Sequence, residues 1–96
     1  MSKKLSKDFT EKINYIRKHG EIISIGEHFG WVVISYGDKL DGLAYRLMVV
    51  FHPTVMRYIN LRLKPMMPPF GRRLEYARKY NVKAGYAETQ MKVTIG

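Results

Sequence analysis

The sequence of 96 residues contains no cysteine, so a structural disulfide and a zinc site built from thiolates are both excluded. Long apolar runs are also absent: the longest, Leu47–Phe51, is far shorter than the ~18 residues that a membrane-spanning helix needs. The first segment, Met1–Lys12, lacks the apolar core of a secretory signal. We therefore expect a single soluble domain over residues 1–96, located in the cytoplasm.

Acidic residues are scarce in the second half of the chain. The first 41 residues hold seven Lys/Arg and six Asp/Glu, whereas the remaining 55 hold ten Lys/Arg and two Asp/Glu. The stretch 57–83 has eight basic residues and only Glu75 against them. A net charge of +9 that is concentrated in this way attracts polyanions, namely DNA, RNA or an acidic protein surface. The alternative is that the charge only keeps the protein soluble.

Residues with the spacing of a catalytic or metal site are lacking as well. The three histidines, His19, His28 and His52, fall at a predicted helix end and in two predicted turns, and their spacing matches no metal-binding motif. Asp38 and Asp41 have the chemistry of an acid pair, but they stand in "DKLDG", which is typical of a turn. We therefore predict that the protein is not an enzyme and that it uses no metal and no cofactor.

The N-terminal segment has the pattern of an amphipathic helix. Its apolar residues recur at spacings of four, four and three, which places them on one face: Leu5, Phe9, Ile13 and Ile16. We predict that Asp8 and Glu11 form a capping box at the start of this helix. Gly20 is expected to end it in a left-handed conformation.

Four segments after this helix are predicted to be strands: residues 21–26, 30–37, 43–51 and 57–64. The last of them shows the clearest alternation, with Ile59, Leu61 and Leu63 facing inward and a basic outer face. Pro53 interrupts the chain before it, because proline cannot donate a hydrogen bond to a sheet.

The remaining chain predicts a second helix over residues 71–81, with Leu74, Ala77 and Tyr80 facing inward, and a short strand within residues 89–96. The predicted fold is therefore α+β. It consists of an N-terminal helix, an antiparallel meander of about four strands, a proline-rich loop and a C-terminal helix, with the helices packed on one face of the sheet.

Three of the chain's four prolines and two of its six methionines stand in one short segment, "KPMMPPFGRR", which runs from Lys64 to Arg73. Prolines restrict the backbone, and an ordered segment loses less entropy when it binds. Methionine offers adaptable apolar contact, and a large aromatic side chain offers an anchor. We interpret the segment as a protein-docking loop whose contacts are Met66, Met67, Pro68, Pro69 and Phe70. The alternative is a plain spacer with its methionines in the core.

Pro68 is a candidate isomerisation switch, because it stands between Met67 and Pro69 and both of its peptide bonds involve proline nitrogens. Such bonds adopt the cis form at a cost of about 0.5–1 kcal/mol and interconvert slowly. If the loop docks, the complex should select one isomer of the Met67–Pro68 bond. A host prolyl isomerase is then an expected helper.

Basic and aromatic residues alternate through the predicted second helix, which favours a binding surface for a partner or for nucleic acid. We predict that this helix presents its cations outward with one tyrosine beside them: Arg72, Arg73, Tyr76, Arg78 and Lys79. The tyrosine has the alternative of packing into the core with its hydroxyl at the rim. No helix-turn-helix, zinc-finger or RNA-recognition signature is present, so a direct nucleic-acid-binding module stays the second hypothesis.

The segments "MSKKLSKDFTEKINYIRKHG" and "INLRLKPMMPPFGRRLEYARKY" resemble the anti-RecBCD accessory proteins of lambdoid bacteriophages, and the likeness extends over most of the chain. The resemblance implies a non-enzymatic phage protein of the host cytoplasm that binds the host RecBCD helicase–nuclease through its RecC subunit. It further implies an altered response to Chi sites that favours phage recombination, with DNA near the complex as a possible second contact. The family offers no compact motif, so no contact residue is carried over.

Overall fold

The protein has an α+β fold in the computed structural model, which describes residues 5–80 and, as backbone only, residues 87–91. Along the chain the elements are α1 (Lys7–His19), β1 (Gly20–His28), β2 (Trp31–Asp38), β3 (Ala44–Val50), α2 (Pro53–Arg62), the 3-10 helix η1 (Lys64–Met66), α3 (Phe70–Lys79) and β4 (Ala87–Met91). None of the helices in these described ranges is long and apolar enough to cross a membrane.

The four strands form one sheet in the order β1-β2-β3-β4. The first three are antiparallel neighbours, as predicted, and Ile34 pairs with both Ile25 and Leu47. β4 overlaps the predicted last strand and lies parallel to β3. The rest of that last strand, residues 92–96, lies outside the described part of the chain. The antiparallel meander has three strands and not about four, because the fourth predicted strand, residues 57–64, is helical.

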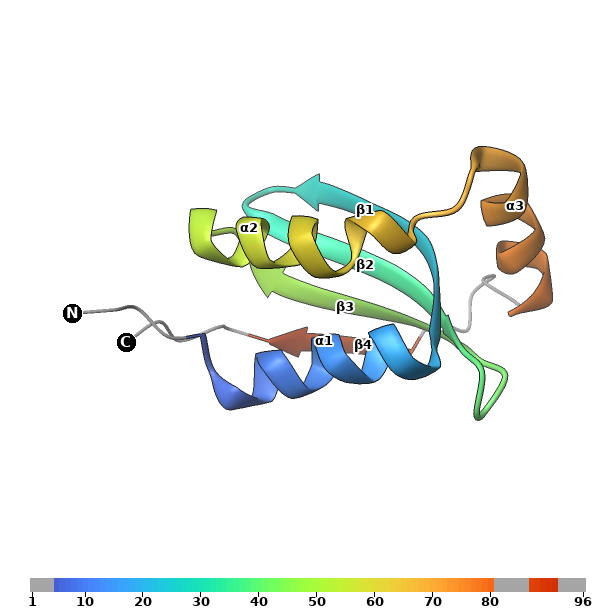
Figure 1. The fold of residues 1–96 in the computed structure, drawn as a ribbon, viewed down its shortest axis with the longest axis horizontal. Coiled ribbons are helices and arrows are strands. Elements are labelled where there is room, and N and C mark those ends of the chain that lie inside the picture. Colours follow the sequence, from blue (N-terminus) through green and yellow to red (C-terminus); the bar gives the residue numbers. More distant parts are fainter. Residues whose placement is uncertain (1–4, 81–86, 92–96) are drawn as a thin grey trace.

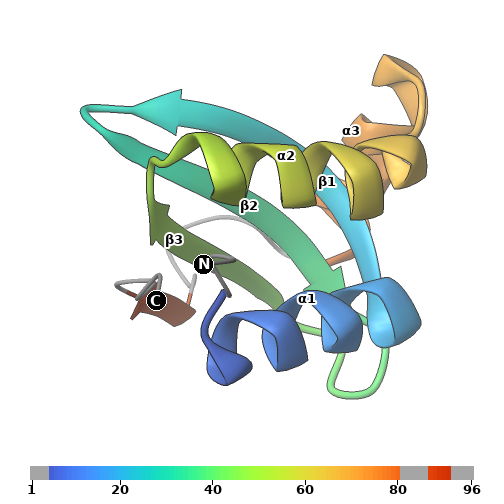
Figure 2. The ribbon, with the colours of Figure 1, turned by 60° about the vertical axis from the view of Figure 1, so that its left-hand side comes forward.

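The core lies between one face of the sheet and the two helices α1 and α2, which lie side by side on that face (Figure 1, Figure 2). Three of the apolar residues that the spacing placed on one face lie in α1 and are buried there: Phe9, Ile13 and Ile16. The fourth, Leu5, precedes the helix and is partly buried. The buried cluster comprises Phe9, Ile13, Ile16, Ile22, Val32, Ile34, Tyr36, Leu47, Val49, Val55, Ile59 and Leu63. This cluster holds the sheet and the two helices together.

Both predicted ends of α1 differ from the structure. The N-cap is Ser6, whose side chain accepts a hydrogen bond from the Phe9 N–H at 3.2 Å, so the predicted capping box at Asp8 is wrong. Gly20 is extended, with φ of −100° and ψ of 155°, and it is the first residue of β1. Glycine is needed there because a Cβ would lie 2.8 Å from the Ile16 carbonyl oxygen.

The prediction of a strand over residues 57–64 is wrong, since this stretch lies in α2 and η1. His52 caps α2 by accepting a hydrogen bond from the Thr54 N–H at Nδ1, and Pro53 occupies the first turn, where proline is favourable. Val55, Ile59 and Leu63 recur at a spacing of four and are fully buried, whereas Leu61 is 69% exposed. The apolar residues Ile59 and Leu63 therefore belong to a helical stripe that begins at Val55, and the alternation of residues 59–63 was not the pattern of a strand.

Candidate docking surface

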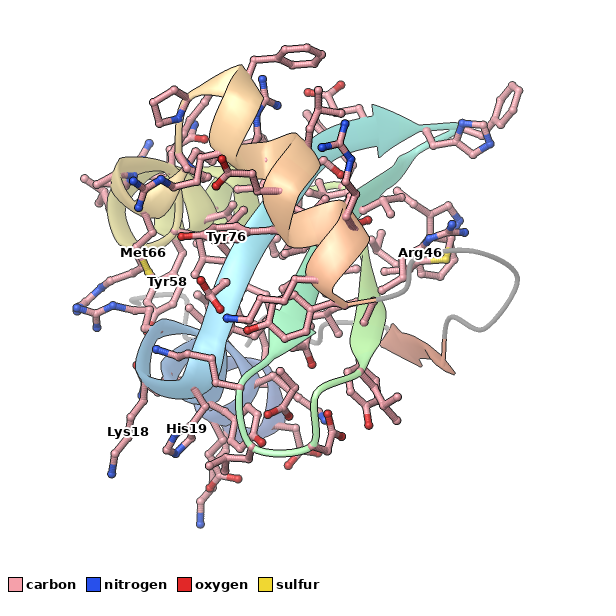
Figure 3. The ribbon with its side chains drawn as sticks, turned by 90° about the vertical axis from the view of Figure 1, so that its right-hand side faces the viewer. Lys18, His19, Arg46, Tyr58, Met66 and Tyr76 are labelled. Carbon is pink, nitrogen blue, oxygen red and sulfur yellow. The ribbon has the colours of Figure 1, made fainter. Side chains whose placement is uncertain are left out.

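The helix α3 is the part of the described chain that contributes least to the core. It lies at one end of the molecule, away from α1 and α2, and contacts the first part of β1 (Figure 1). None of its ten residues is fully buried. The predicted helix of residues 71–81 is thus present at residues 70–79, but its expected inward residue Leu74 is 43% exposed and Ala77 is only half-buried. Figure 3 views this end of the molecule, with α3 in front of the sheet.

Tyr80, the residue that follows α3, holds the end of the helix to the sheet. Its side chain is buried, as predicted, and a Cβ on Gly37 would overlap its ring. Gly37 and Tyr36 are neighbours in β2 and therefore point to opposite faces of the sheet, so Tyr80 packs on the face that α1 and α2 leave open. The backbone N–H of Tyr80 also donates to the Tyr76 carbonyl oxygen at 2.9 Å.

Glu21 of β1 is the polar contact point for the last turn of α3. Lys79 lies 3.0 Å from one of its carboxylate oxygens, and the hydroxyl of Tyr80 donates to the same oxygen. Burial alone would raise the pKa of Glu21, but hydrogen bonds from Tyr80, Lys79 and Tyr76 outweigh it and hold the pKa below its ordinary value. Glu21 therefore stays ionised and attached to α3 at neutral pH.

The outer side of α3 carries an apolar row. Phe70 is 67% exposed, and Leu74, one turn further along, lies beside it. Arg78 continues the same row at the same spacing of four and is exposed. We call Phe70, Leu74 and Arg78 the α3 row. Sequence reasoning missed Leu74 as a surface residue, although its spacing from Phe70 and Arg78 carried that information.

The four predicted cations of this helix do not lie on one common surface. Arg72 is exposed, but helical spacing places it on the flank opposite the α3 row, beyond Glu75. Arg73 is half-buried, with its guanidinium 5.5 Å from the centre of the Phe70 ring and its Nε buried without a hydrogen-bond partner among the described residues. Lys79 keeps its ion pair with Glu21. Arg78 is the cation that stands in line with the exposed apolar pair.

The proline segment contributes to the core as well as to the surface. Met66 and Met67 are half-buried and pack against the core cluster, as the spacer interpretation had it. Pro68 is half-buried, whereas Pro69 is exposed and precedes α3 as its N-cap residue. The peptide bonds of the described chain are all trans, including the Met67–Pro68 bond. The predicted docking contacts are therefore most accessible at Pro69 and Phe70.

The two aspartates that were weighed as an acid pair stabilise the β2–β3 turn. Asp38 is buried and accepts hydrogen bonds from the Tyr15 hydroxyl at 2.6 Å and the Leu40 N–H at 2.8 Å. The bond to Asp38 raises the pKa of Tyr15 to about 12. Asp41 accepts from the Leu43 N–H at 2.8 Å. Within the described residues, no three His, Cys, Asp or Glu side chains are grouped so that they could hold a metal ion.

Comparison with known proteins identifies no relative: no family model, no curated protein and no solved structure matches the chain.

Proposed function

We propose that the protein is a non-enzymatic modulator that docks onto the host RecBCD helicase–nuclease through its RecC subunit, in the host cytoplasm. In this proposal binding alters the enzyme's response to Chi sites and favours phage recombination. The resemblance of the sequence to the anti-RecBCD accessory proteins supports the identity of the partner. The α3 row supports docking as the mode of action, and we assign it as the main contact.

One observation carries the docking proposal: α3 buries no residue, yet it exposes Phe70 and Leu74 side by side. Neighbouring exposed apolar side chains are unfavourable in water and are typical of interaction sites. An aromatic anchor with an adjacent arginine is the composition that binding hot spots favour. Phe70 and Leu74 are joined to Arg78 in one row, so α3 has this composition on its outer side.

The test is a direct binding measurement with purified components. Immobilised RecBCD is titrated with the wild-type protein by biolayer interferometry at physiological salt, and the same protein is titrated against a fluorescent duplex and a single strand without RecBCD. The proposal predicts saturable binding to RecBCD and much weaker binding to bare DNA. A protein that binds bare DNA tightly and ignores RecBCD contradicts it.

Direct binding of nucleic acid is the second candidate, and the excess of positive charge after residue 41 favours it. Arg72 and Arg78 are both exposed and would neutralise phosphates. In that case the affinity for DNA falls steeply with salt, with a slope that reflects the number of neutralised phosphates. A steep slope together with tight binding at physiological salt would put this candidate ahead of the protein modulator. DNA held near RecBCD remains a possible second contact in the first proposal.

A host prolyl isomerase is part of the proposal through Pro68. We expect freshly refolded protein to gain binding activity in a slow phase that a prolyl isomerase accelerates. Replacing Pro68 with Ala raises the cost of a cis bond to about 2.5–4 kcal/mol. A complex that requires the cis form should then weaken by roughly 2–3 kcal/mol, and one that keeps the trans form should not change. Full activity in the fast folding phase would reduce Pro68 to a rigid spacer.

A further inference from the structure

The tip of the β1–β2 hairpin exposes a single large apolar side chain. Phe29 is 90% exposed, more than any other large hydrophobic residue that the structure describes. It stands with Gly30 in a two-residue turn between His28, the last residue of β1, and Trp31, the first residue of β2, which pair with each other. An apolar ring in this position gains nothing from the core and is fully available to a partner.

The backbone at Phe29 makes phenylalanine an unfavourable choice for folding alone. Its φ is 48°, and Gly30 has a φ of 81°, so both central residues of the turn are left-handed. Turns of this kind favour Asn-Gly, Asp-Gly or Gly-Gly, because only glycine and short polar residues adopt positive φ at low cost. Exposure and backbone strain therefore both oppose Phe29 in the free protein.

The backbone of the tip is hydrogen-bonded to the sheet despite its position at an extremity. The N–H of Phe51, just after β3, donates to the Gly30 carbonyl oxygen at 2.8 Å and so fastens the turn to the third strand. The ring of His28 lies edge-on to the Phe29 ring, with 4.4 Å between the ring centres. The backbone of the turn is thus ordered before a partner binds, which lowers the entropy that binding costs.

The charges at the tip indicate what kind of partner it fits. From Glu27 to Trp31 the chain has no lysine or arginine, and Glu27 is exposed. The nearest cations that the structure describes, Arg46 and Lys64, come from β3 and η1 and line hollows beside Glu27 rather than the tip itself. A phosphate backbone or an anionic membrane at the tip would therefore meet the carboxylate of Glu27. An apolar pocket on a protein takes a phenyl ring without needing a cation. The tip thus differs in chemistry from the basic α3.

The tip and α3 lie along the same edge of the sheet. β1 is an edge strand, α3 is attached to its beginning through Glu21, and Phe29 follows its end (Figure 1, Figure 2). The eight residue steps from Glu21 to Phe29 span roughly 26 Å at ~3.3 Å per residue. A partner that is large enough to cover this distance along β1 can contact both α3 and the tip.

We propose that Phe29 is a second anchor, which inserts into an apolar pocket of the same partner protein that the α3 row contacts. The inference rests on the proposed function, since it assigns a further contact to that interaction. It adds an apolar contact at the opposite end of β1 from the basic helix. Binding through two rigidly connected sites fixes the orientation of the protein on its partner.

The test replaces Phe29 with Asn, which suits the left-handed turn. We expect Phe29→Asn to melt at the same temperature as the wild type or higher, and to bind immobilised RecBCD at least ~10-fold more weakly, a loss of about 1.4 kcal/mol. Phe29→Tyr, which keeps the ring, should bind within about threefold of the wild type. The matched control is Leu61→Asn, because Leu61 is also a large exposed apolar side chain, 69% exposed, but it lies on α2 and belongs neither to the tip nor to the α3 row.

The possible outcomes separate this inference from the proposed function. If the wild type binds RecBCD and the Phe29→Asn variant binds it with the same affinity, the second anchor is overturned and the proposed function stays intact. No binding by the wild type overturns both. A clear fall in the melting temperature of Phe29→Asn also overturns the second anchor. So does a variant that binds RecBCD like the wild type but binds single-stranded DNA or anionic vesicles more weakly.

Discussion

The helices α2 and α3 have the same length of ten residues, and each has apolar residues at a spacing of four. In α2 the row of Val55 and Ile59, continued by Leu63, is fully buried. In α3 the row of Phe70 and Leu74 faces solvent. The same period therefore serves the core in one helix and remains available to a partner in the other. Periodicity identifies an apolar face but does not say what covers it.

The largest effect that this comparison predicts is on stability. Ile59→Ala should lower the free energy of unfolding by about 3–4 kcal/mol, because it opens a cavity in the core. Leu74→Ala, the matching deletion in α3, should change it by less than about 0.5 kcal/mol, since the side chain is already half in water. Urea denaturation of both variants measures the difference. Equal losses would mean that α3 is a core helix.

A second variant tests how α3 is attached. Gly37→Ala should cost about 2 kcal/mol, because the added methyl group overlaps the buried ring of Tyr80. Hydrogen exchange should show faster exchange in α3, with α1 and α2 little changed. In a Tyr80→Ala background the same substitution should be nearly neutral, because the clash is gone. Additive costs in the double variant would show that Gly37 acts independently of Tyr80.

Acid should loosen α3 before it unfolds the core. Contacts with Tyr80 and Lys79 lower the pKa of Glu21 in the folded state, so this carboxylate stabilises the fold above its ordinary pKa of 4.5. That contribution disappears as the pH falls through the lower folded pKa. Glu21→Gln should lose about 1 kcal/mol at pH 7, and its stability should change less than the wild type's between pH 6 and pH 3. Parallel urea curves across this range decide the matter, and an identical pH dependence would contradict the role of Glu21.

The smallest stability effects are expected from charge reversal on the surface of α3. Arg78→Glu and Arg72→Glu should each change stability by less than about 0.5 kcal/mol. Arg78→Glu should slow association with RecBCD by about tenfold, because Arg78 continues the α3 row, whereas Arg72→Glu should slow it less. Stopped-flow association rates at two salt concentrations measure this order. Wild-type rates for both would leave the cations as a solvated face.

Much of the fold followed from the sequence, because α1 and the first three strands have uninterrupted apolar patterns. α2 did not, since residues 57–64 alternate like a strand and the longer spacing from Val55 through Ile59 to Leu63 was not weighed against that alternation. The parallel pairing of β4 with β3 is a non-local contact that no local pattern specifies. Phe70 was found from composition, but the exposure of Leu74 and the half-burial of Met66 and Met67 depend on where α3 attaches to β1. Phe29 was missed because residues 27–29 were treated only as the connection between two predicted strands, without regard to the residue at its tip.

The central claim is that the exposed row of α3 binds a partner and does not support the fold. The most direct measurement compares the double variant Phe70→Ser/Leu74→Ser with the wild type in two assays, thermal melting and affinity for immobilised RecBCD. The account predicts an unchanged or higher melting temperature and an affinity at least ~30-fold weaker, which is about 2 kcal/mol. A variant that binds as tightly as the wild type, or that loses affinity only because it unfolds, would contradict the account.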